Sequence, residues 1–271
     1  MTFVAALPMY DWSEARAETD AQWAALRDAL RAAGMDAPEH LVRRNADLPA
    51  VPGGISDQAG NVVAPDPATM PPDELDMHML WRHPALLFGQ TCWGPMELGL
   101  GEHVQVVGQP DYSTFEGGDG AFYSSAIVMR KGETRRQQPP GGGEAILPIE
   151  VMRGARLAFN GPDSMSGVIA LTRDLEAAGE NLDLFGGSVE TGSHRGSVVA
   201  VAGGKADICA VDCRTWALVK RFEPMATDVE VVGWTARRKG LPYITSRHVP
   251  PEVVDGMRDA LVRGGLAFPA L

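Results

Sequence analysis

The segment from Gly154 to Arg173 carries residue types and a spacing suited to binding an anion. Leu157–Phe159 is apolar and strand-like, the next four residues are turn formers, and Asp163 or Ser164 can cap the helix that follows. At a helix N-terminus the first backbone N–H groups have no internal partner, and the helix dipole favours negative charge. The segment therefore predicts a site for a phosphate, sulfate or carboxylate group.

Side chains in the same segment add to this prediction. Ser164 and Ser166 supply hydroxyl donors, and Gly167 lets a ligand approach the backbone. Asp163 repels a dianion, but it can accept a proton from a protonated phosphate oxygen or pair with an ammonium group. An ordinary capped helix with no ligand is the alternative interpretation.

Further candidate residues also follow predicted strands. Ligands bind outside the carboxyl ends of strands in an open parallel sheet, so we expect these turns to converge on one cleft. Each residue also has a structural alternative: His194 and Asp212 as helix caps or bonded partners, and Tyr10 as a partly buried aromatic. The predicted ligand-binding residues are Tyr10, Thr91, Tyr112, Ser125, Asp163, Ser164, Ser166, Thr191, Ser193, His194 and Asp212.

Composition excludes several other functions. The net charge is -11 with only four lysines among 271 residues, so no basic face is available for nucleic acid or an anionic membrane. Cys92, Cys209 and Cys213 give neither a disulfide framework nor a zinc pattern, and we expect them in the core or in turns. The sequence predicts no metal site and no cofactor.

The first residues contain no basic region and no apolar stretch of signal-peptide length. We therefore expect a cytoplasmic protein, or a periplasmic one if a leader has been removed. No apolar run approaches the roughly 18 to 20 residues of a membrane span, so direct membrane insertion is not expected.

Strands and helices are predicted to alternate through the first part of the chain. Expected strands are 3–7, 40–42, 84–89 and 104–107, and expected helices are 18–33 and 73–81, with a further short helix after 94. Alternation of this kind predicts parallel strands with right-handed crossovers. Residues 47–72 are rich in Pro and Gly and are interpreted as a long loop, either a lid, an interface arm or a surface insertion.

A second α/β unit is predicted to begin with an extended segment at 121–130. A polar loop at 132–144 follows this segment, and the other strands and helices of the unit come after the loop. Its strands are expected at 157–159, 186–190 and 206–211, and its helices after 164 and at 194–203 and 213–221. Strands at 229–234 and 242–245 and a helix at 250–263 are expected to return to the first unit.

Sequence motifs of several enzyme classes are absent from the chain. It has no Gly-x-Ser-x-Gly elbow, no P-loop, no His-Glu-x-x-His and no Gly-x-Gly-x-x-Gly that opens a helix after a strand. Ser193 and His194 are neighbours in sequence, which does not place a nucleophile against a base. A covalent hydrolase is not expected.

The chain resembles the phosphate/phosphonate-type substrate-binding proteins of ABC transporters. Seven motifs carry the resemblance, in the family's order: ALPMYD (6–11), GQTCWG (89–94), YSSAIVMR (123–130), AFNGPDSMSG (158–167), TGSHR (191–195), GKADICAVD (204–212) and VGWT (232–235). The resemblance implies an α/β, two-lobed periplasmic-binding-protein fold of type II, each lobe a mixed, mainly parallel sheet flanked by helices. It implies one lobe from 1–112 with 229–271, another from 123–224, and a ligand held in the cleft between them.

Three functions are compatible with these observations. The first is a solute-binding protein, not an enzyme, that captures a small anionic or zwitterionic ligand such as phosphate, a phosphonate or an amino acid, with ABC transporter membrane subunits as its partners. The second is a cytosolic enzyme on the same fold that acts on a small carboxylated metabolite, with His194 or Asp212 as general acid or base. The third is a cytosolic sensor that passes its closed state to a partner protein.

Overall fold

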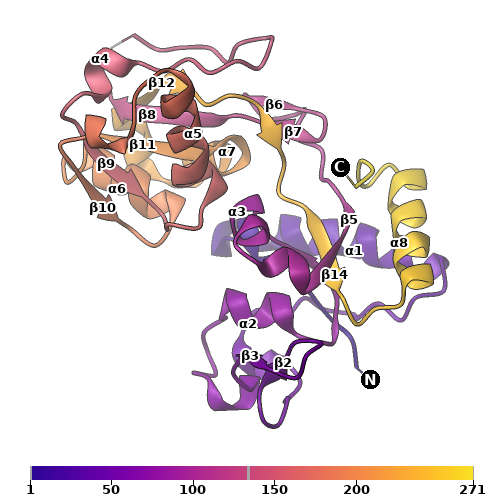
Figure 1. Cartoon of the computed structure of the whole chain (residues 1–271). Helices are drawn as coiled ribbons and strands as arrows, with labels where there is room; N and C mark the ends of the chain where they lie inside the picture. The colour runs from indigo at the N-terminus through magenta and orange to yellow at the C-terminus, as the bar shows by residue number, and fades with distance from the viewer. Residues whose placement is uncertain (1, 133–134, 271) are drawn as a thin grey trace. The chain divides into compact units, whose positions relative to one another are not determined.

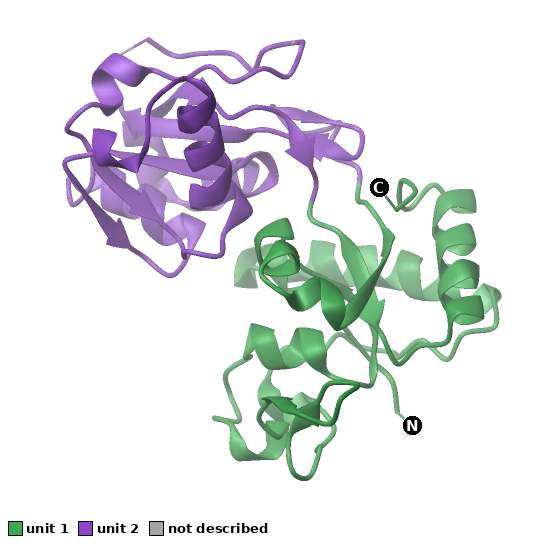
Figure 2. Ribbon diagram, viewed as in Figure 1, with its two compact units in different colours: residues 1–110, 241–271 green, residues 111–240 purple. Residues whose placement is uncertain are grey.

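The protein divides into two compact units of similar architecture. A computed structural model describes residues 2–132 and 135–270. Residues 1–110 with 241–271 form unit 1, and residues 111–240 form unit 2 (Figure 2). In each unit a mixed sheet is flanked by helices (Figure 1), as the sequence predicts.

The sheet of unit 1 has four strands in the order β1-β4-β14-β5. β1 (Val4–Ala6) lies parallel to β4 (Leu86–Gln90), but β14 (Tyr243–Ser246) runs antiparallel to β4 and to β5 (Val104–Gly108). The parallel alignment predicted from the first part of the chain is confirmed for β1 and β4, and the antiparallel β14 makes the sheet mixed, as the resemblance implies. This strand arrives from the C-terminal part of the chain, and the local alternation of strand and helix carries no information about it.

Helices cover both faces of this sheet. α1 (Arg16–Ala32) and α8 (Pro251–Arg263) pack their apolar residues, among them Leu26 and Met257, against Phe88 of β4. α2 (Met77–Arg82) packs on the opposite face. α3 (Trp93–Glu97) follows β4 directly.

The segment 47–72 is a packed part of unit 1. It contains the hairpin of β2 (Ile55–Ser56) and β3 (Val62–Ala64), and Ile55 is only 2% exposed in the core cluster that holds α2. The prediction of an irregular loop is therefore wrong here. Two- and three-residue strands are too short to show a period, and the surrounding Pro and Gly residues conceal them.

Two other boundaries in unit 1 differ from the prediction. Residues 40–42 form no strand, although the Val42 N–H donates to the Ala5 carbonyl at 2.8 Å. α2 begins at Met77 because Asp76, and not Asp73, accepts from the Met79 N–H at 2.8 Å.

The sheet of unit 2 has five strands in the order β10-β9-β11-β8-β12. β10 is parallel to β9 and β9 to β11, whereas β8 runs antiparallel to both of its neighbours. The bounds are β8 (Ser125–Arg130), β9 (Arg156–Phe159), β10 (Gly187–Glu190), β11 (Ile208–Asp212) and β12 (Val229–Trp234).

The pairing of β12 shows that the predicted boundary between the two lobes is wrong. The sequence analysis assigns 229–234 to the first lobe, but β12 pairs with β8 from Val229↔Arg130 to Trp234↔Ala126. The strand therefore completes the sheet of unit 2, and the chain returns to unit 1 only after Gly240. Its apolar sequence suits a buried strand in either unit, which is why sequence alone misplaces it.

Four helices and a small second sheet complete unit 2. α5 (Ala170–Ala177) packs Leu171 and Leu175 on one face of the main sheet, and α6 (His194–Ala202) and α7 (Cys213–Phe222) also contact its strands. The remaining elements are α4 (Ile149–Met152) and the sheet of β6 (Gly118–Asp119), β7 (Phe122–Tyr123) and β13 (Arg238–Lys239).

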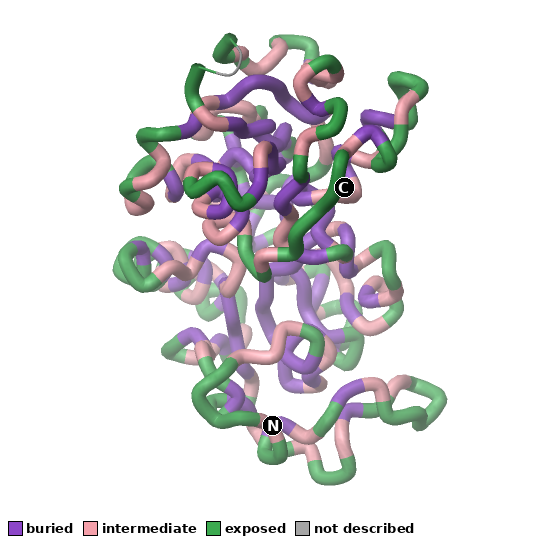
Figure 3. Tube along the Cα trace, turned by 90° about the vertical axis from the view of Figure 1, so that its left-hand side faces the viewer, coloured by how far each residue is buried: buried purple, intermediate pink, exposed green. Residues whose placement is uncertain are grey.

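Buried residues gather along the strands, and exposed residues lie mainly in loops and on outer helix surfaces (Figure 3). All residues of β4, β11 and β14 are buried. The three cysteines are buried and free, which confirms their expected core positions. Of the polar loop predicted at 132–144, residues 133 and 134 lie outside the described residues.

Candidate ligand-binding site

Three neighbouring strands of unit 2 bring polar residues to one edge of its sheet. β9 and β11 are parallel and end at Phe159 and Asp212, while the antiparallel β8 begins at Ser125, which pairs with Asp212. The carboxyl ends of β9 and β11 therefore meet the amino end of β8. We call this set the polar edge of unit 2; its members are Ser125, Asn160, Ser164, Ser166, His194 and Asp212.

The predicted anion-binding turn forms a capped helix start. Ser164 is the N-cap, and its Oγ accepts from the Gly167 N–H at 3.1 Å. Residues Met165–Ile169 form a π-helical turn that continues into α5. π-helical turns are rare and are frequent at functional sites. Since the helix begins here, the N–H groups of Met165 and Ser166 have no acceptor within the helix.

Asn160, and not a ligand, fills the space next to Gly167. A methyl group at Gly167 would overlap Asn160 Oδ1 and would lie 3.0 Å from Ser164 Oγ. The expectation that this glycine admits a ligand to the backbone is therefore wrong. The missing side chain instead allows Asn160 to fold against the first turn of the helix.

A hydrogen bond joins the helix start to α6. Ser166 Oγ lies 2.8 Å from His194 Nε2, and the same nitrogen lies 3.7 Å from Asp212 Oδ2. Asp212 also caps α7, because its Oδ1 accepts from the Thr215 N–H at 2.9 Å. In a Ser-His-Asp triad the serine and the carboxylate contact opposite ring nitrogens. Here both face Nε2, so these residues do not form a triad.

Burial lowers the pKa of His194 below its usual value of 6.5. The charge of Asp212 and the backbone of Ala210 act in the opposite sense and only partly offset this effect. The imidazole is therefore neutral at pH 7. It supplies one N–H donor and one acceptor and adds no full positive charge to the polar edge.

Two side-chain atoms of the polar edge are buried and make no hydrogen bond to the residues that the structure describes. They are Ser125 Oγ and Asn160 Oδ1. The backbone N–H of Ser125 is satisfied, since it donates to Thr235 Oγ1 at 2.8 Å. Buried polar atoms in native proteins nearly always have a partner, so these atoms mark a place where a ligand can supply one.

Two predicted ligand donors are engaged within their own turn. Thr191 Oγ1 has the Phe159 carbonyl at 3.0 Å and Ser197 Oγ at 2.7 Å, and Ser193 caps α6 by accepting from the Gly196 N–H at 3.0 Å. They hold the turn between β10 and α6 that positions His194. Their contact with a ligand stays a prediction.

The remaining predicted residues belong to unit 1 or to other positions of unit 2. Tyr112 is fully buried in unit 2, and its ring centroid lies 5.6 Å from that of Tyr123. Tyr10 and Thr91 are buried in unit 1, and Asp163 is partly buried just before the Ser164 cap. The prediction that a ligand is held between two lobes also stays a prediction.

Sequence reasoning missed two residues and underrated a third. Thr235 and Gln109 are buried polar residues, 1% and 0% exposed, and Asn160 was considered only as a turn former. Thr235 and Gln109 each come directly after a strand, which is the signal that could have found them.

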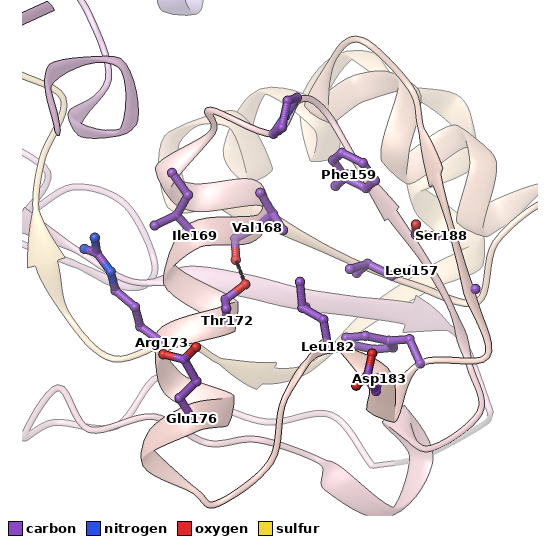
Figure 4. Close-up of a pocket in the computed structure, with 13 residues that line it drawn as sticks. Leu157, Phe159, Val168, Ile169, Thr172, Arg173, Glu176, Leu182, Asp183 and Ser188 are labelled. Carbon is purple, nitrogen blue, oxygen red and sulfur yellow. Dashed lines mark hydrogen bonds between the residues drawn. The ribbon is translucent and has the colours of Figure 1, made fainter. Parts of the chain in front are cut away.

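A separate groove of about 640 Å³ lies on unit 2 and is mainly apolar (Figure 4). Leu157 and Phe159 of β9 line one side, Val168 and Ile169 of the helix start line another, and Leu182 lies between them. None of the predicted ligand-binding residues lines this groove.

Neither a candidate metal site nor a membrane-spanning helix is found among residues 2–132 and 135–270. Within these ranges no three His, Cys, Asp or Glu side chains are grouped so that they could hold a metal ion. No helix of the described chain combines the length and the apolar character required to cross a membrane.

Two α/β units, joined by chain crossings after 110 and after 240, give the chain the fold of the type II periplasmic binding proteins. PhnD1 from Prochlorococcus marinus, solved with methylphosphonate, is 15% identical with a TM-score of 0.59, over 96% of this chain and 83% of that one. The binding-protein component of an ABC phosphonate transporter from Pseudomonas aeruginosa is 13% identical with a TM-score of 0.57, over 95% and 72%. A histidine kinase sensor domain similar to periplasmic binding proteins is 12% identical with a TM-score of 0.55, over 97% and 91%.

At sequence identities this low, the similarity to the solved structures shows only that the fold is shared. The sequence itself matches the family described as ABC transporter, phosphonate, periplasmic substrate-binding protein over residues 101–266, which is more than half of the chain. The chain belongs to this family. No curated protein matches it significantly.

Membership confirms the predicted resemblance and the predicted class of function. The protein is a substrate-binding component of the ABC-transporter type and not an enzyme. The alternative of an enzyme acting on a carboxylated metabolite is therefore wrong.

Proposed function

We propose that the polar edge of unit 2 binds the oxyanion group of a small solute, with a phosphonate or phosphate as the ligand class. The supporting observation is the buried Ser125 Oγ without a hydrogen-bond partner among the described residues, next to the capped helix start at Ser164. A hydroxyl donor and two helix N–H groups suit the three oxygens of a phosphonate. The phosphonate description of the family and the methylphosphonate bound by PhnD1 point to the same ligand class.

The polar edge favours an oxyanion that still carries a proton. Asn160 Oδ1 is a buried acceptor without a partner in the described part of the chain, and the carboxylate of Asp212 lies in the same cluster. A fully ionised phosphonate offers no donor to these acceptors, and it would be repelled by the carboxylate. A monoprotonated phosphonate or phosphate supplies one O–H donor and meets less repulsion.

Titration calorimetry with methylphosphonate and inorganic phosphate tests this function. Ser166→Ala removes one donor and the contact with His194, and it should weaken binding by roughly 1 to 3 kcal/mol. Ser188→Ala removes an exposed hydroxyl from β10 and should leave the affinity unchanged. Equal affinities of the wild type and Ser166→Ala would remove the polar edge from the proposal.

The partners and the compartment follow from the same proposal. We infer that the protein acts in the periplasm and delivers its solute to the membrane subunits of an ABC transporter, as the family description suggests. Cell fractionation of the native producer and solute-dependent ATPase activity of the reconstituted transporter test these two points. Recovery in the cytosol would favour the intracellular sensor instead.

A further inference from the structure

A polar groove of about 440 Å³ lies on unit 1 and shares no residue with the polar edge of unit 2. Four segments distant in sequence line it: the β2–β3 hairpin, the last residue of α2, the turn before β5 and the residues after β14. Two arginines and two histidines are therefore brought to one groove of a chain whose net charge is -11. The charged and titratable lining residues are Asp57, Arg82, Glu102, His103, Arg247 and His248.

Arg82 is a half-buried cation without a counter-ion. Its Nη1 donates to the His78 carbonyl at 3.2 Å, and it forms no ion pair with a residue that the structure describes. Burial lowers the pKa of Arg82, and the charge of Asp76 opposes this effect. Because it is costly to take a charge out of water without a partner, an anion bound here would offset part of that cost.

Arg247 supplies a second guanidinium, which the backbone holds in place. Its Nη2 donates to the carbonyls of Gly101 and Val104 at 2.7 and 3.1 Å, and its backbone N–H donates to the His103 carbonyl at 3.0 Å. Over residues 2–132 and 135–270, its Nη1 and Nε have no acceptor and its charge has no carboxylate partner. A fixed guanidinium with unused N–H groups is well suited to bind an oxyanion.

His103 shows that the charges of the two arginines reach the same place. Burial lowers the pKa of its imidazole, and the positive charges of Arg82 and Arg247 lower it further. Glu102 and Asp57 act in the opposite sense and only partly offset these effects. An anion bound next to both arginines would therefore raise the pKa of His103.

The two carboxylates of the groove are not paired with its arginines. Asp57 accepts three hydrogen bonds within its own hairpin, at 2.8 to 3.1 Å, and Glu102 is exposed. Their charges balance those of the arginines while both histidines are neutral. Protonation of His103 and His248 gives the groove a net positive charge, so its affinity for an anion should increase as the pH decreases.

We propose that Arg82 and Arg247 form a second anion site, on unit 1, that binds a doubly charged oxyanion such as sulfate. Guanidinium groups donate paired N–H bonds that fit the oxygens of such an ion. This preference differs from that of the polar edge of unit 2, which favours an oxyanion that carries a proton. The inference goes beyond the proposed function and does not depend on it, since the two sites have no residue in common.

Titration with sodium sulfate, compared with sodium chloride at equal ionic strength, tests this site. Sulfate stays doubly charged between pH 7.5 and pH 5.5, so any change in its affinity over this range comes from the protein. Affinity should increase by roughly 3- to 10-fold as the pH decreases over this range. In NMR spectra assigned with His103→Gln, the pKa of His103 should be higher in sulfate than in chloride.

Two arginine variants of unit 1 separate the site from a general charge effect. Arg82→Gln should weaken sulfate binding by roughly 10- to 100-fold, and without sulfate it should unfold at the same or a higher temperature. Arg44→Gln removes an exposed arginine that pairs with Asp47, and it should leave the sulfate affinity unchanged. Methylphosphonate should bind Arg82→Gln as tightly as the wild type.

Several outcomes would overturn the second site and leave the proposed function in place. They are a sulfate effect that chloride matches, a pKa of His103 that sulfate does not change, and full sulfate affinity in Arg82→Gln. Equal losses in Arg82→Gln and Arg44→Gln would also refute it, because they would show a general charge effect. If Ser166→Ala loses sulfate binding, sulfate occupies the polar edge of unit 2 and the site on unit 1 is refuted.

Discussion

At the scale of single residues, burial without a partner separates binding groups from structural ones. Ser164, Thr191 and Ser193 all have hydroxyl groups engaged in caps or turns, whereas Ser125 Oγ is not bonded to any residue that the structure describes. Sequence reasoning treats these hydroxyls alike, because each lies at or near the end of a predicted strand. The hydrogen-bond partners depend on side-chain directions, which the order of residue types does not contain.

Ser125→Ala should weaken ligand binding without weakening the fold. The hydroxyl is 0% exposed and unbonded within the described chain, so its loss should change the free energy of unfolding by less than about 0.5 kcal/mol. The affinity for methylphosphonate should fall by about 1 kcal/mol, or five- to tenfold. Calorimetry and denaturant unfolding measure the two quantities.

Thr235→Val is the structural counterpart of that variant. It removes the acceptor of the Ser125 N–H and should destabilise the fold by about 1 to 3 kcal/mol. If Ser125→Ala destabilises the protein as much as Thr235→Val does, then the serine hydroxyl has a structural partner and the interpretation of its burial is wrong.

His194 should make the stability of the protein depend on pH below about 6.5. Its pKa is lowered by burial in the folded state, so between that lowered value and 6.5 the unfolded chain binds a proton that the folded chain does not. The free energy of unfolding should therefore decrease as the pH decreases through this window. Above the window it should keep its full value. Between pH 7.5 and pH 5.5, the unfolding temperature of His194→Gln should decrease less than that of the wild type.

His40→Gln, which removes an exposed imidazole, serves as the control in the same scan. Identical pH profiles of the wild type and His194→Gln would mean that His194 is not kept neutral by its surroundings.

At the scale of elements, the start of α5 is where the sequence was most informative. Turn formers, a serine cap and a periodic apolar run predict the helix beginning, and the structure confirms Ser164 as the cap. The π-helical turn and the folding of Asn160 against Gly167 were not predicted. Both depend on how β9 and α5 pack, whereas cap and periodicity are local properties.

Gly167→Ala tests this local packing. The added methyl overlaps Asn160 Oδ1 and crowds Ser164 Oγ, so Asn160 must move and the cap is disturbed. We expect a loss of about 1 to 2 kcal/mol in the free energy of unfolding and a weaker affinity for phosphonate. Gly187→Ala is a control, since a methyl there meets nothing within 4 Å. Full phosphonate affinity in Gly167→Ala would show that the helix start is not part of the site.

The strand order shows where element prediction fails. Sequence patterns locate most helices and strands of unit 2 within a few residues, but they place β12 in the wrong unit and give no direction for β14. Both strands reach their sheets from distant parts of the sequence. Periodicity finds an element, but the choice of its neighbour is a tertiary decision.

At the scale of the whole molecule, a protein with a net charge of -11 must bind anions through local donors. The polar edge of unit 2 relies on hydroxyls, helix N–H groups and a neutral imidazole, and it contains no lysine or arginine. Such a site discriminates by hydrogen-bond geometry and protonation rather than by charge alone.

Ligand binding should raise the unfolding temperature of the full chain. At a free concentration one hundred times the dissociation constant, methylphosphonate should stabilise the protein by about 2.7 kcal/mol. For a chain of this size we expect an increase of roughly 5 to 10 °C by calorimetry. Sodium chloride at equal ionic strength should not reproduce the increase, and Ser166→Ala should need more ligand to reach it. A shift that chloride matches would indicate a general salt effect.

A crystal structure of the protein with methylphosphonate would be the sharpest test of the proposed oxyanion site. The proposal predicts phosphonate oxygens within about 3.2 Å of Ser125 Oγ and of the N–H groups at the start of the Ser164 helix. A phosphonate bound in the groove lined by Leu157 and Leu182, or one that makes no contact with the polar edge of unit 2, would contradict it.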